Sequence, residues 1–464
     1  MIEFRNKEGI YFIGIGGIGM SALALYFEKG GFSIAGYDRS ESTLSRSLAE
    51  AGCTITYIDD VTCLPDLFGN VAHKEKVIIV YTPAIPAENK ILAHFRDNGY
   101  SLFKRSEILG EISQHTDVLA VSGTHGKTTV STMLAHLLKQ SSVDCSAFLG
   151  GISKNYGSNL LLGEGRYTVM EADEFDRSFH RLKPLMAVVT ALDADHLDIY
   201  GDRATMVEAY NVFCAKIRPG GFLVVNSKIR NEIISPDGVS VFTYGLNEDA
   251  DFRAFNIVRH GDYYRFDLKT PDSLIEDLHF AFPGIINIEN FTSAIAIATM
   301  CGVTKDEIRK GVMLFRGVKR RFDIRINIPG LAYIDDYAHH PDEIRACITS
   351  VREYFRGRHI TGIFQPHLFS RTADHAGGFA DILDELDEVI LLPIYPAREK
   401  PVAGVTSELI FNKMKSPNKR LLEKSDIPGK LDAEKIDVLL TIGAGDIDLL
   451  AGPIEEKLME VRGK

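Results

Sequence analysis

The sequence lacks the paired cysteines on which disulfide-rich and zinc-binding proteins depend. Its six cysteines are scattered over 464 residues, and no two of them form a C-x-x-C pair. Isolated cysteines are typical of reduced thiols in a cytosolic protein, whereas structural disulfides and zinc sites use closely spaced ones. We therefore expect a cytoplasmic protein.

The sequence also lacks an excess of basic residues. It has 52 Lys and Arg against 63 Asp and Glu, which gives a net charge of −11. Proteins that bind nucleic acid through its phosphates usually carry a basic face, so we expect no nucleic-acid partner. Small anionic substrates stay possible, because backbone N–H groups and single lysines can hold them.

A long apolar segment is missing as well. Residues 9–27 carry no charge, but four glycines interrupt them, and no small-residue cleavage site is evident. We expect neither a membrane span nor a signal peptide, and thus no membrane partner. The length instead predicts an ordinary globular chain of two to four domains.

The stretch that carries the strongest functional signal is residues 117–140. An apolar run at 117–121 predicts a buried strand, and apolar spacing at 130–139 predicts a helix, with a glycine-containing turn between them. Such a turn can cradle phosphates at a helix N-terminus. Lys127 could reach the outer phosphates and Thr128 could ligate Mg²⁺. The segment predicts a nucleoside triphosphate site, and an ordinary glycine turn before a helix is the alternative.

A second glycine loop lies near the start of the sequence. A predicted strand at 10–13 leads into G-x-G-x-x-G at Gly14 to Gly19, and a strand at 33–37 ends at Asp38. This is the pattern of dinucleotide-binding proteins. It fits NAD, the diphosphate of another nucleotide, or a plain βαβ turn.

Acidic residues follow two predicted strands of the central region. The strand at 167–170 ends in EADEFD at 171–176, and the next strand ends at Asp193, Asp195 and His196. Oxygen ligands at a strand end near a phosphate loop suit Mg²⁺, although a solvated acidic turn is the alternative. His196 becomes a candidate metal or phosphate contact.

The remaining sequence predicts an antiparallel appendage and a final α/β domain. Residues 237–283 read as short strands with turns, and a basic run at 316–321 marks a domain boundary, where such a run is usually a solvated face. Four later predicted strands, ending near 334, 364, 392 and 442, are each followed by polar residues. In a parallel sheet these would gather at one edge and bind a ligand.

Several longer segments carry a family resemblance. They are GIGGIGMSALA from Gly14, GTHGKTT from Gly123, EADEFD from Glu171, DADHLDIYGD from Asp193, DDYAHHPDEI from Asp335, FQPH with SRT from Phe364, and GAGDI from Gly443. Together they resemble the Mur ligases of peptidoglycan synthesis over essentially the whole chain. The resemblance implies an α/β protein of three domains. These are a Rossmann-like UDP-sugar-binding domain at 1–105, a central ATP-binding domain at 106–322 with a P-loop ATPase-like parallel sheet and a small antiparallel appendage, and a Rossmann-like amino-acid-binding domain at 323–464.

The resemblance also implies residue roles. UDP-sugar binding falls to Gly16, Gly17, Ile18, Gly19, Asp38, Thr82, Arg105 and Asn159. ATP binding falls to Gly123, Thr124, His125, Gly126, Lys127, Thr128, Thr129, Asn287, Asn290, Arg321 and Asp336. The metal ligands would be Thr128, Glu171 and His196, and the amino-acid site His339, His340, His367 and Arg371. Lys127, Glu171, His196 and Arg371 would be catalytic.

Three positions depart from the family pattern. Ile286 stands where a histidine usually precedes Asn287, and Leu368 stands where an arginine is common, which leaves Arg371 as the candidate carboxylate clamp. Residues 210–212 contain no lysine at the place where other Mur ligases carry a carbamylated one, so we predict no carbamate.

The activity implied by the resemblance is ATP-driven amide formation. The enzyme would join L-alanine to the muramoyl carboxylate of UDP-N-acetylmuramate through an acyl phosphate, with ATP and Mg²⁺, as a monomer or weak homodimer. The nearest alternative adds a whole tripeptide to the same sugar nucleotide. An NAD-dependent oxidoreductase would leave the Lys127 loop unexplained, and the acids and histidine at 171–196 argue against it and against a regulatory nucleotide-binding protein.

Overall fold

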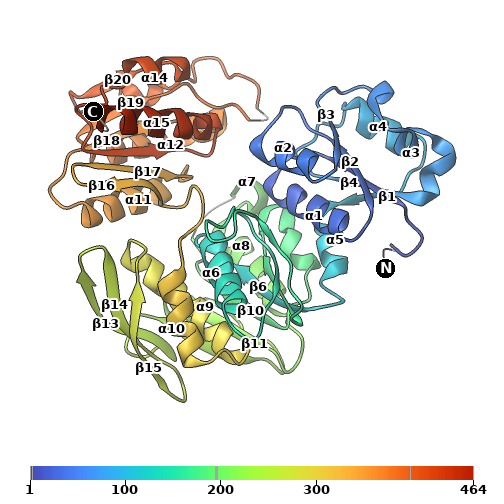
Figure 1. Cartoon of the computed structure of the whole chain (residues 1–464), viewed down its shortest axis with the longest axis horizontal. Helices are drawn as coiled ribbons and strands as arrows, with labels where there is room; N and C mark the ends of the chain where they lie inside the picture. Colours follow the sequence, from blue (N-terminus) through green and yellow to red (C-terminus); the bar gives the residue numbers. More distant parts are fainter. Residues whose placement is uncertain (1, 3, 194–196, 398, 463–464) are drawn as a thin grey trace. The chain divides into compact units, whose positions relative to one another are not determined.

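A computed structural model describes residues 2, 4–193, 197–397 and 399–462 of the chain. The chain forms two compact units, Met1–Arg316 and Gly317–Lys464, and the break falls within the predicted basic run (Figure 1). Helices and strands alternate along most of both units, which confirms the predicted α/β class. The finer division at residues 105 and 322 stays a prediction.

The first sheet of the larger unit is parallel and five-stranded, in the order β3-β2-β1-β4-β5. Its strands are β1 Gly9–Ile13, β2 Ser33–Tyr37, β3 Thr54–Thr56, β4 Val77–Tyr81 and β5 Leu102–Lys104. The accompanying helices are α1 Ile18–Lys29, α2 Thr43–Glu50, α3 Asp66–Gly69, α4 Lys90–Asp97 and α5 Arg105–Ile112. Alternate residues of β1 enter two different apolar clusters, so both faces of the sheet are covered. The predicted strands at 10–13 and 33–37 are confirmed.

The second sheet has ten strands, in the order β15-β14-β13-β12-β11-β10-β6-β9-β7-β8. They are β6 Asp117–Ser122, β7 Ser146–Phe148, β8 Leu160–Leu161, β9 Tyr167–Glu171, β10 Met186–Val189, β11 Phe222–Asn226, β12 Ser240–Gly245, β13 Phe252–His260, β14 Tyr263–Lys269 and β15 Leu274–Phe280. Strands β7, β9, β6, β10, β11, β12 and β13 pair in parallel, whereas β13, β14 and β15 pair antiparallel. The predicted parallel sheet with an antiparallel appendage is thus confirmed.

Five α-helices accompany this sheet in the described residues: α6 Lys127–Lys139, α7 Leu197–Tyr200, α8 Arg203–Cys214, α9 Ile285–Met300 and α10 Lys305–Leu314. The short 3₁₀ helices are distributed over the whole chain: η1 Val61–Cys63 and η2 Val71–Lys76 near the first sheet, η3 Phe175–Arg181 and η4 Ser227–Glu232 near the second, and η5 Lys424–Asp426 and η6 Asp446–Leu450 in the smaller unit. Helix α6 packs against α9, and its apolar residues are fully buried, as their spacing predicts. It begins three residues before the predicted start at 130, because Gly126 turns the chain in the left-handed region at φ 81°.

The smaller unit has one six-stranded sheet, in the order β16-β17-β21-β18-β19-β20. Its strands are β16 Asp323–Ile328, β17 Leu331–Asp336, β18 Ile360–Phe364, β19 Glu388–Leu391, β20 Lys419–Leu421 and β21 Val438–Ile442. Its α-helices are α11 Pro341–Tyr354, α12 Phe369–Leu383, α13 Glu408–Phe411, α14 Ile427–Lys430 and α15 Ala451–Arg462. Only β16 pairs antiparallel among the described strands of this sheet. The predicted polar strand ends therefore meet at one edge.

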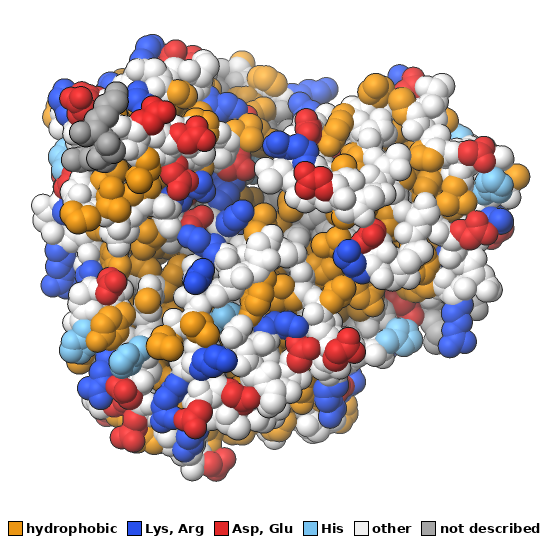
Figure 2. All heavy atoms as spheres, viewed as in Figure 1, with side chains coloured by type: hydrophobic (Ala, Val, Ile, Leu, Met, Phe, Trp, Pro, Cys, Tyr) orange, Lys and Arg blue, Asp and Glu red, His pale blue; other side chains and the backbone are white. Residues whose placement is uncertain are grey.

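Surface and cysteine features agree with the composition. Acidic and basic side chains are intermixed over much of the face drawn in Figure 2. All six cysteines lie within the described residues and are free thiols. No helix in the described part of the chain is long and apolar enough to cross a bilayer.

Candidate active site

The loop between β6 and α6 has the backbone of a phosphate cradle. Gly123 lies at φ 132°, and a Cβ there would stand 2.0 Å from the hydroxyl oxygen of Thr190, so only glycine fits. The Thr190 hydroxyl also donates to the carbonyl of His125. These contacts hold the loop against the residue that follows β10.

Lys127 lies folded over this loop. Its Nζ donates to the carbonyl oxygens of Gly123 at 2.7 Å and Thr124 at 3.2 Å, and to Oε1 of Glu174 at 2.8 Å. Burial alone would lower the pKa of Lys127, but the carboxylates of Glu174 and Asp173 outweigh it and the net shift raises the pKa. The ammonium therefore stays charged, as a phosphate contact requires.

Thr128 and Glu171 form a pair of oxygen ligands beside Lys127. The Thr128 hydroxyl donates to Oε1 of Glu171 at 3.1 Å, and the N–H of Gly150 donates to Oε2 at 3.1 Å. A Cβ on Gly150 would lie 2.2 Å from that same oxygen, so the glycine leaves room for the carboxylate. A hydroxyl and a carboxylate oxygen suit Mg²⁺. The predicted third ligand, His196, lies outside the described residues.

Two of the predicted ATP contacts, Asn290 and Asn287, lie near the same loop. Asn290 on α9 lies beside the loop, since a Cβ on Gly126 would stand 3.1 Å from its Oδ1. Its Nδ2 lies 3.5 Å from Oδ1 of Asn287, and the Nδ2 of Asn287 donates to the carbonyl of Pro283 at 2.6 Å. Thr129 follows in the first turn of α6.

His125 lies close to Asp193, in the segment that follows β10. Its Nε2 lies 3.7 Å from Oδ2 of Asp193, and the Asp193 N–H donates to the Thr124 hydroxyl at 3.1 Å. The predicted loop residues therefore share one edge of the sheet with this acidic strand end.

The N-terminal glycine loop is braced by an acid from the next strand. The N–H of Gly16 donates to Oδ2 of Asp38 at 2.7 Å, and the N–H of Arg39 donates to Oδ1 at 2.7 Å. Gly14 adopts φ 88°, and a Cβ there would lie 2.8 Å from Cγ2 of Thr82. Asp38 and Thr82, both predicted sugar-nucleotide residues, thus adjoin the loop directly.

Two predicted residues from further along the chain reach the same loop. A Cβ on Gly19 would lie 2.9 Å from Nη1 of Arg105, and Asn159 donates to the carbonyl of Ile18 at 2.6 Å. Arg105 also lies 3.6 Å from the carboxylate of Asp173. With Gly17 as the N-cap of α1, the structure brings all eight predicted sugar-nucleotide residues around one loop.

In the smaller unit, three of the four predicted amino-acid contacts gather at the sheet edge. Nη1 of Arg371 lies 3.2 Å from Nδ1 of His367, and the rings of His339 and His367 are 6.0 Å apart. Burial lowers the pKa of His339, which favours a neutral imidazole. His340 instead contacts His375, at a ring distance of 4.9 Å.

Asp336 and Arg321, predicted ATP contacts, also belong to this unit. Asp336 accepts hydrogen bonds from the N–H groups of Phe322 at 2.6 Å and Ala338 at 2.8 Å. Burial raises the pKa of Asp336 to about 6. The guanidinium of Arg321 lies over the ring of Tyr337, 5.0 Å from its centroid.

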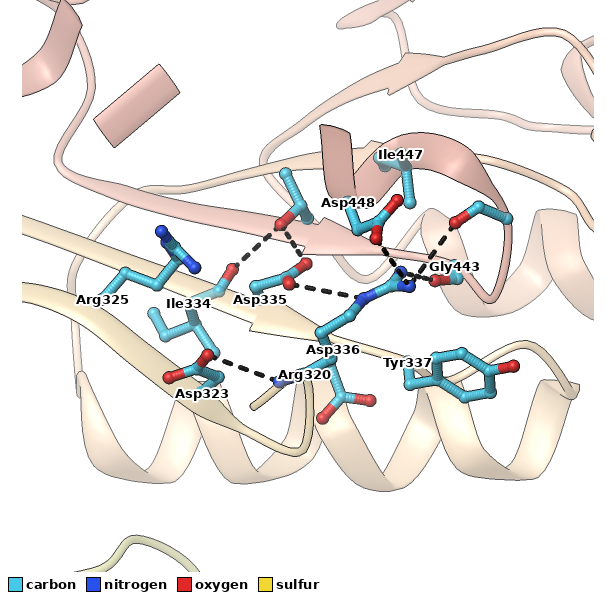
Figure 3. Close-up of polar contacts among 12 residues, drawn as sticks. Arg320, Asp323, Arg325, Ile334, Asp335, Asp336, Tyr337, Gly443, Ile447 and Asp448 are labelled. Carbon is cyan, nitrogen blue, oxygen red and sulfur yellow. Dashed lines mark hydrogen bonds and ion pairs between the residues drawn. The ribbon is translucent and has the colours of Figure 1, made fainter. Parts of the chain in front are cut away.

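The neighbouring Arg320 was not predicted to have a structural role, because the basic run reads as a solvated face. Figure 3 shows its guanidinium directed toward Asp335, Asp448 and the carbonyl of Gly443. Asp335 is buried, 1% exposed, and also accepts from the Thr441 hydroxyl at 2.7 Å. Arg320 therefore supplies the charge that a buried carboxylate needs.

Sequence reasoning also missed Glu174, His375 and Tyr395. Glu174 was included in the acidic segment, but only its partner in space, Lys127, distinguishes it from the other acids. The Tyr395 ring stacks on that of His367 at 5.8 Å, from a strand end 28 positions away. Only the expected meeting of strand ends at one edge could have indicated this pair.

Family models and curated proteins match nearly the whole chain. Residues 9–116 match the family model described as "Mur ligase family, catalytic domain", residues 121–298 match "Mur ligase middle domain", and residues 320–453 match "Mur ligase, glutamate ligase domain". The UDP-N-acetylmuramate–L-alanine ligase of Parabacteroides distasonis is 48% identical over 458 residues, which cover 98% of each chain.

Solved structures give the same picture. The UDP-N-acetylmuramate–alanine ligase of Thermotoga maritima superposes with a TM-score of 0.81 at 26% identity, over 98% of this chain and 99% of that one. A murein peptide ligase from Psychrobacter arcticus reaches a TM-score of 0.72 at 22% identity over 98% of this chain and 99% of that one, which shows a shared fold.

Proposed function

The chain belongs to the Mur ligase family, and from that premise we propose that it joins L-alanine to the muramoyl carboxylate of UDP-N-acetylmuramate at the expense of ATP. It is an enzyme that forms a carbon–nitrogen bond in peptidoglycan precursor synthesis. The proposal is supported by relatives of this activity at 48% identity over 98% of the chain. The observation that carries the chemistry is the charged Lys127 beside the Thr128–Glu171 pair.

The first step transfers a phosphoryl group. A carboxylate is a poor electrophile, so an oxygen of the muramoyl carboxylate attacks the γ-phosphorus of ATP. The bond from the γ-phosphorus to the bridging oxygen breaks, ADP leaves, and an acyl phosphate forms. Lys127 would stabilise the negative charge on the phosphoryl oxygens, in a reaction that depends mostly on position and electrostatics.

Mg²⁺ fits this site and would be held by Thr128 and Glu171, with His196 as the further predicted ligand. When bound, it would neutralise charge on the phosphate oxygens. The contribution of this chain is the arrangement of the ligands, since Gly150 fixes one carboxylate oxygen and the Thr128 hydroxyl contacts the other.

The second step forms the amide. The free amine of L-alanine attacks the acyl carbon, and the tetrahedral intermediate expels inorganic phosphate while the amine nitrogen loses a proton. In the smaller unit, Arg371 would clamp the L-alanine carboxylate, with His339 and His367 beside it, and His340, which contacts His375, stays a predicted contact. Arg321, Asp336, Asn287 and Asn290 are proposed to complete the ATP site.

The glycine loop at Gly16 to Gly19 is proposed to hold the UDP diphosphate, with Asp38, Thr82, Arg105 and Asn159 nearby. One nucleotide loop then serves each of the first two domains, which we place at residues 1–105 and 106–322, before a third at 323–464. A cytoplasmic location and a monomeric or weakly dimeric state remain predictions.

The test is an assay of the purified chain with MgATP and UDP-N-acetylmuramate, with and without L-alanine. We expect ADP, phosphate and the alanyl product in equal amounts, and little ADP when L-alanine is omitted. L-Serine and glycine should also react, but more slowly than L-alanine, because a pocket discriminates against a difference of one small group by only about 1–3 kcal/mol. Efficient use of the L-Ala-D-Glu-diamino acid tripeptide, with L-alanine ignored, would identify a recycling ligase instead.

A further inference from the structure

We propose that Glu174 is a positioning residue that holds the Lys127 ammonium at the phosphate loop throughout the nucleotide cycle. The inference rests on the proposed role of Lys127 in binding ATP phosphates. It concerns a residue outside the predicted metal and nucleotide contacts, and it assigns to Glu174 an effect that acts through Lys127.

The Lys127 ammonium has three N–H donors, and the structure provides three acceptors for them. Two acceptors are the loop carbonyls of Gly123 and Thr124, and the third is Glu174. The two side chains differ in exposure, since that of Lys127 is 15% exposed and that of Glu174 only 1%. The carboxylate is therefore the more deeply buried partner, and its charged hydrogen bond to Lys127 offsets part of the cost of burying it, whereas the ammonium can reach the solvent side.

The backbone of Glu174 is itself held in place. Its carbonyl accepts the Tyr200 hydroxyl at 2.6 Å and the N–H of Arg177 at 2.9 Å. Arg177 adopts φ 53°, a conformation that L-residues seldom take, and its guanidinium lies over the Tyr200 ring at 5.5 Å. These contacts fix the start of η3, so Glu174 presents its carboxylate from a defined position.

Arrival of phosphate requires Lys127 to exchange at least one partner. Releasing a loop carbonyl leaves a neutral group that other donors can satisfy. Releasing Glu174 would break the charged hydrogen bond of a carboxylate that is only 1% exposed, which costs more. Lys127 therefore gives up the loop carbonyls, keeps Glu174, and turns its freed N–H groups to the phosphate oxygens. Its Nζ thus stays in one place instead of following the nucleotide.

The experiment uses the full chain and a double-mutant cycle. The variants are Glu174→Gln, Glu174→Asp, Lys127→Met and the double variant Lys127→Met/Glu174→Gln. Calorimetry measures the Kd of a non-hydrolysable MgATP analogue and of UDP-N-acetylmuramate, and kinetics gives kcat and the KM for each substrate. Glu111→Gln is the matched control, because Glu111 is also buried, 6% exposed, but pairs with His115 away from the loop.

We expect Glu174→Gln to weaken analogue binding by roughly tenfold, the size of a lost charged hydrogen bond. In the Lys127→Met background the same change should have no further effect, because the effect passes through Lys127. Glu174→Asp should recover part of the loss. The Kd of UDP-N-acetylmuramate and the analogue affinity of Glu111→Gln should equal those of the wild type.

Stability provides an independent readout. Lys127→Met removes the charged partner of the buried carboxylate and should lower the unfolding midpoint by roughly 5 °C or more, whereas the double variant should recover most of the lost stability. The inference is overturned if Glu174→Gln binds the analogue as tightly as the wild type or more tightly, or if its loss adds fully to that of Lys127→Met. Failure of the wild type to bind the analogue would instead refute the proposed function.

Discussion

The two glycine loops of the larger unit have the same plan and different chemistry. Each follows a buried parallel strand and opens a helix, α1 in one case and α6 in the other. In the first loop the N–H of Gly16 already pairs with Asp38, and no lysine lies between Gly14 and Gly19. In the second, Lys127 begins the helix among carboxylates. The first is suited to holding a diphosphate, and the second to moving a phosphoryl group.

The comparison shows that a helix N-terminus and glycines supply only the cradle. Both loops have these, and both can approach phosphates closely. What the second loop adds is a charged ammonium fixed by Glu174 and an oxygen pair for a cation, Thr128 and Glu171. Reactivity therefore depends on two side chains at the start of α6, Lys127 and Thr128, and on the acids that β9 and the segment after it bring to them.

Removing the ammonium should separate the two loops most clearly. Lys127→Ala should lower the rate of ligation by roughly a hundredfold or more, because the charge on the transferring phosphoryl group loses its stabilisation. Steady-state kinetics with circular dichroism as a folding control checks this. Near-normal turnover of the folded variant would show that both loops only bind.

A change in the smaller unit should affect neither loop. Arg371→Ala should raise the KM for L-alanine by about tenfold to thirtyfold, since a guanidinium–carboxylate pair is lost. The KM for ATP and for the sugar nucleotide should stay within about twofold, because Arg371 is proposed to contact only L-alanine. Arg371→Lys keeps the charge but not the planar guanidinium, and should recover only part of the lost affinity for L-alanine. A parallel rise in all three KM values would argue against the clamp.

The glycines of the two loops should differ in their tolerance of a methyl group. Gly123→Ala places Cβ at 2.0 Å from Thr190 in a left-handed conformation. It should weaken ATP binding roughly tenfold and lower the free energy of unfolding by about 2 kcal/mol. Gly17→Ala meets nothing closer than 3.4 Å at φ −65°, so its stability should match the wild type. Calorimetry measures nucleotide binding and thermal unfolding measures the stability of both variants. An equal loss of stability in the two variants would contradict the comparison of the loops.

The smallest expected effect concerns the brace of the first loop. Asp38→Ala removes the acceptor of Gly16 N–H and should weaken UDP-N-acetylmuramate binding by about fivefold, within the range of one hydrogen bond. ATP binding should not change. Binding of the sugar nucleotide at wild-type strength would mean that Asp38 does not order the loop for its ligand.

Much of the fold could be predicted from the sequence because local patterns and burial agree. The predicted strands that end near 364 and 442 are confirmed as β18 and β21. Apolar runs without alternation indicate strands covered on both faces, and glycines with positive φ mark the loops between them. Boundaries shift where a glycine conformation decides them, as at Gly126.

The contacts that tune the site could not be predicted, because they join residues that are distant in sequence. Lys127 and Glu174 are 47 positions apart, and Arg320 reaches Gly443 across 123. From the sequence alone such charged residues are expected at the surface, because most charged side chains in proteins are exposed. The expectation fails when one member of an ion pair is buried, as Glu174 and Asp335 are, and burial depends on how the whole chain packs.

The central claim is that the first loop binds the sugar nucleotide and the second binds ATP. It is tested most directly by titrating the full chain with both nucleotides. Calorimetry of the wild type with UDP-N-acetylmuramate, and then with a non-hydrolysable MgATP analogue, should give two independent sites of one nucleotide each. Lys127→Ala should weaken only the second, and NADH should compete for neither. Displacement of one nucleotide by the other, or tighter binding of NADH at the first loop than of the sugar nucleotide, would contradict the account.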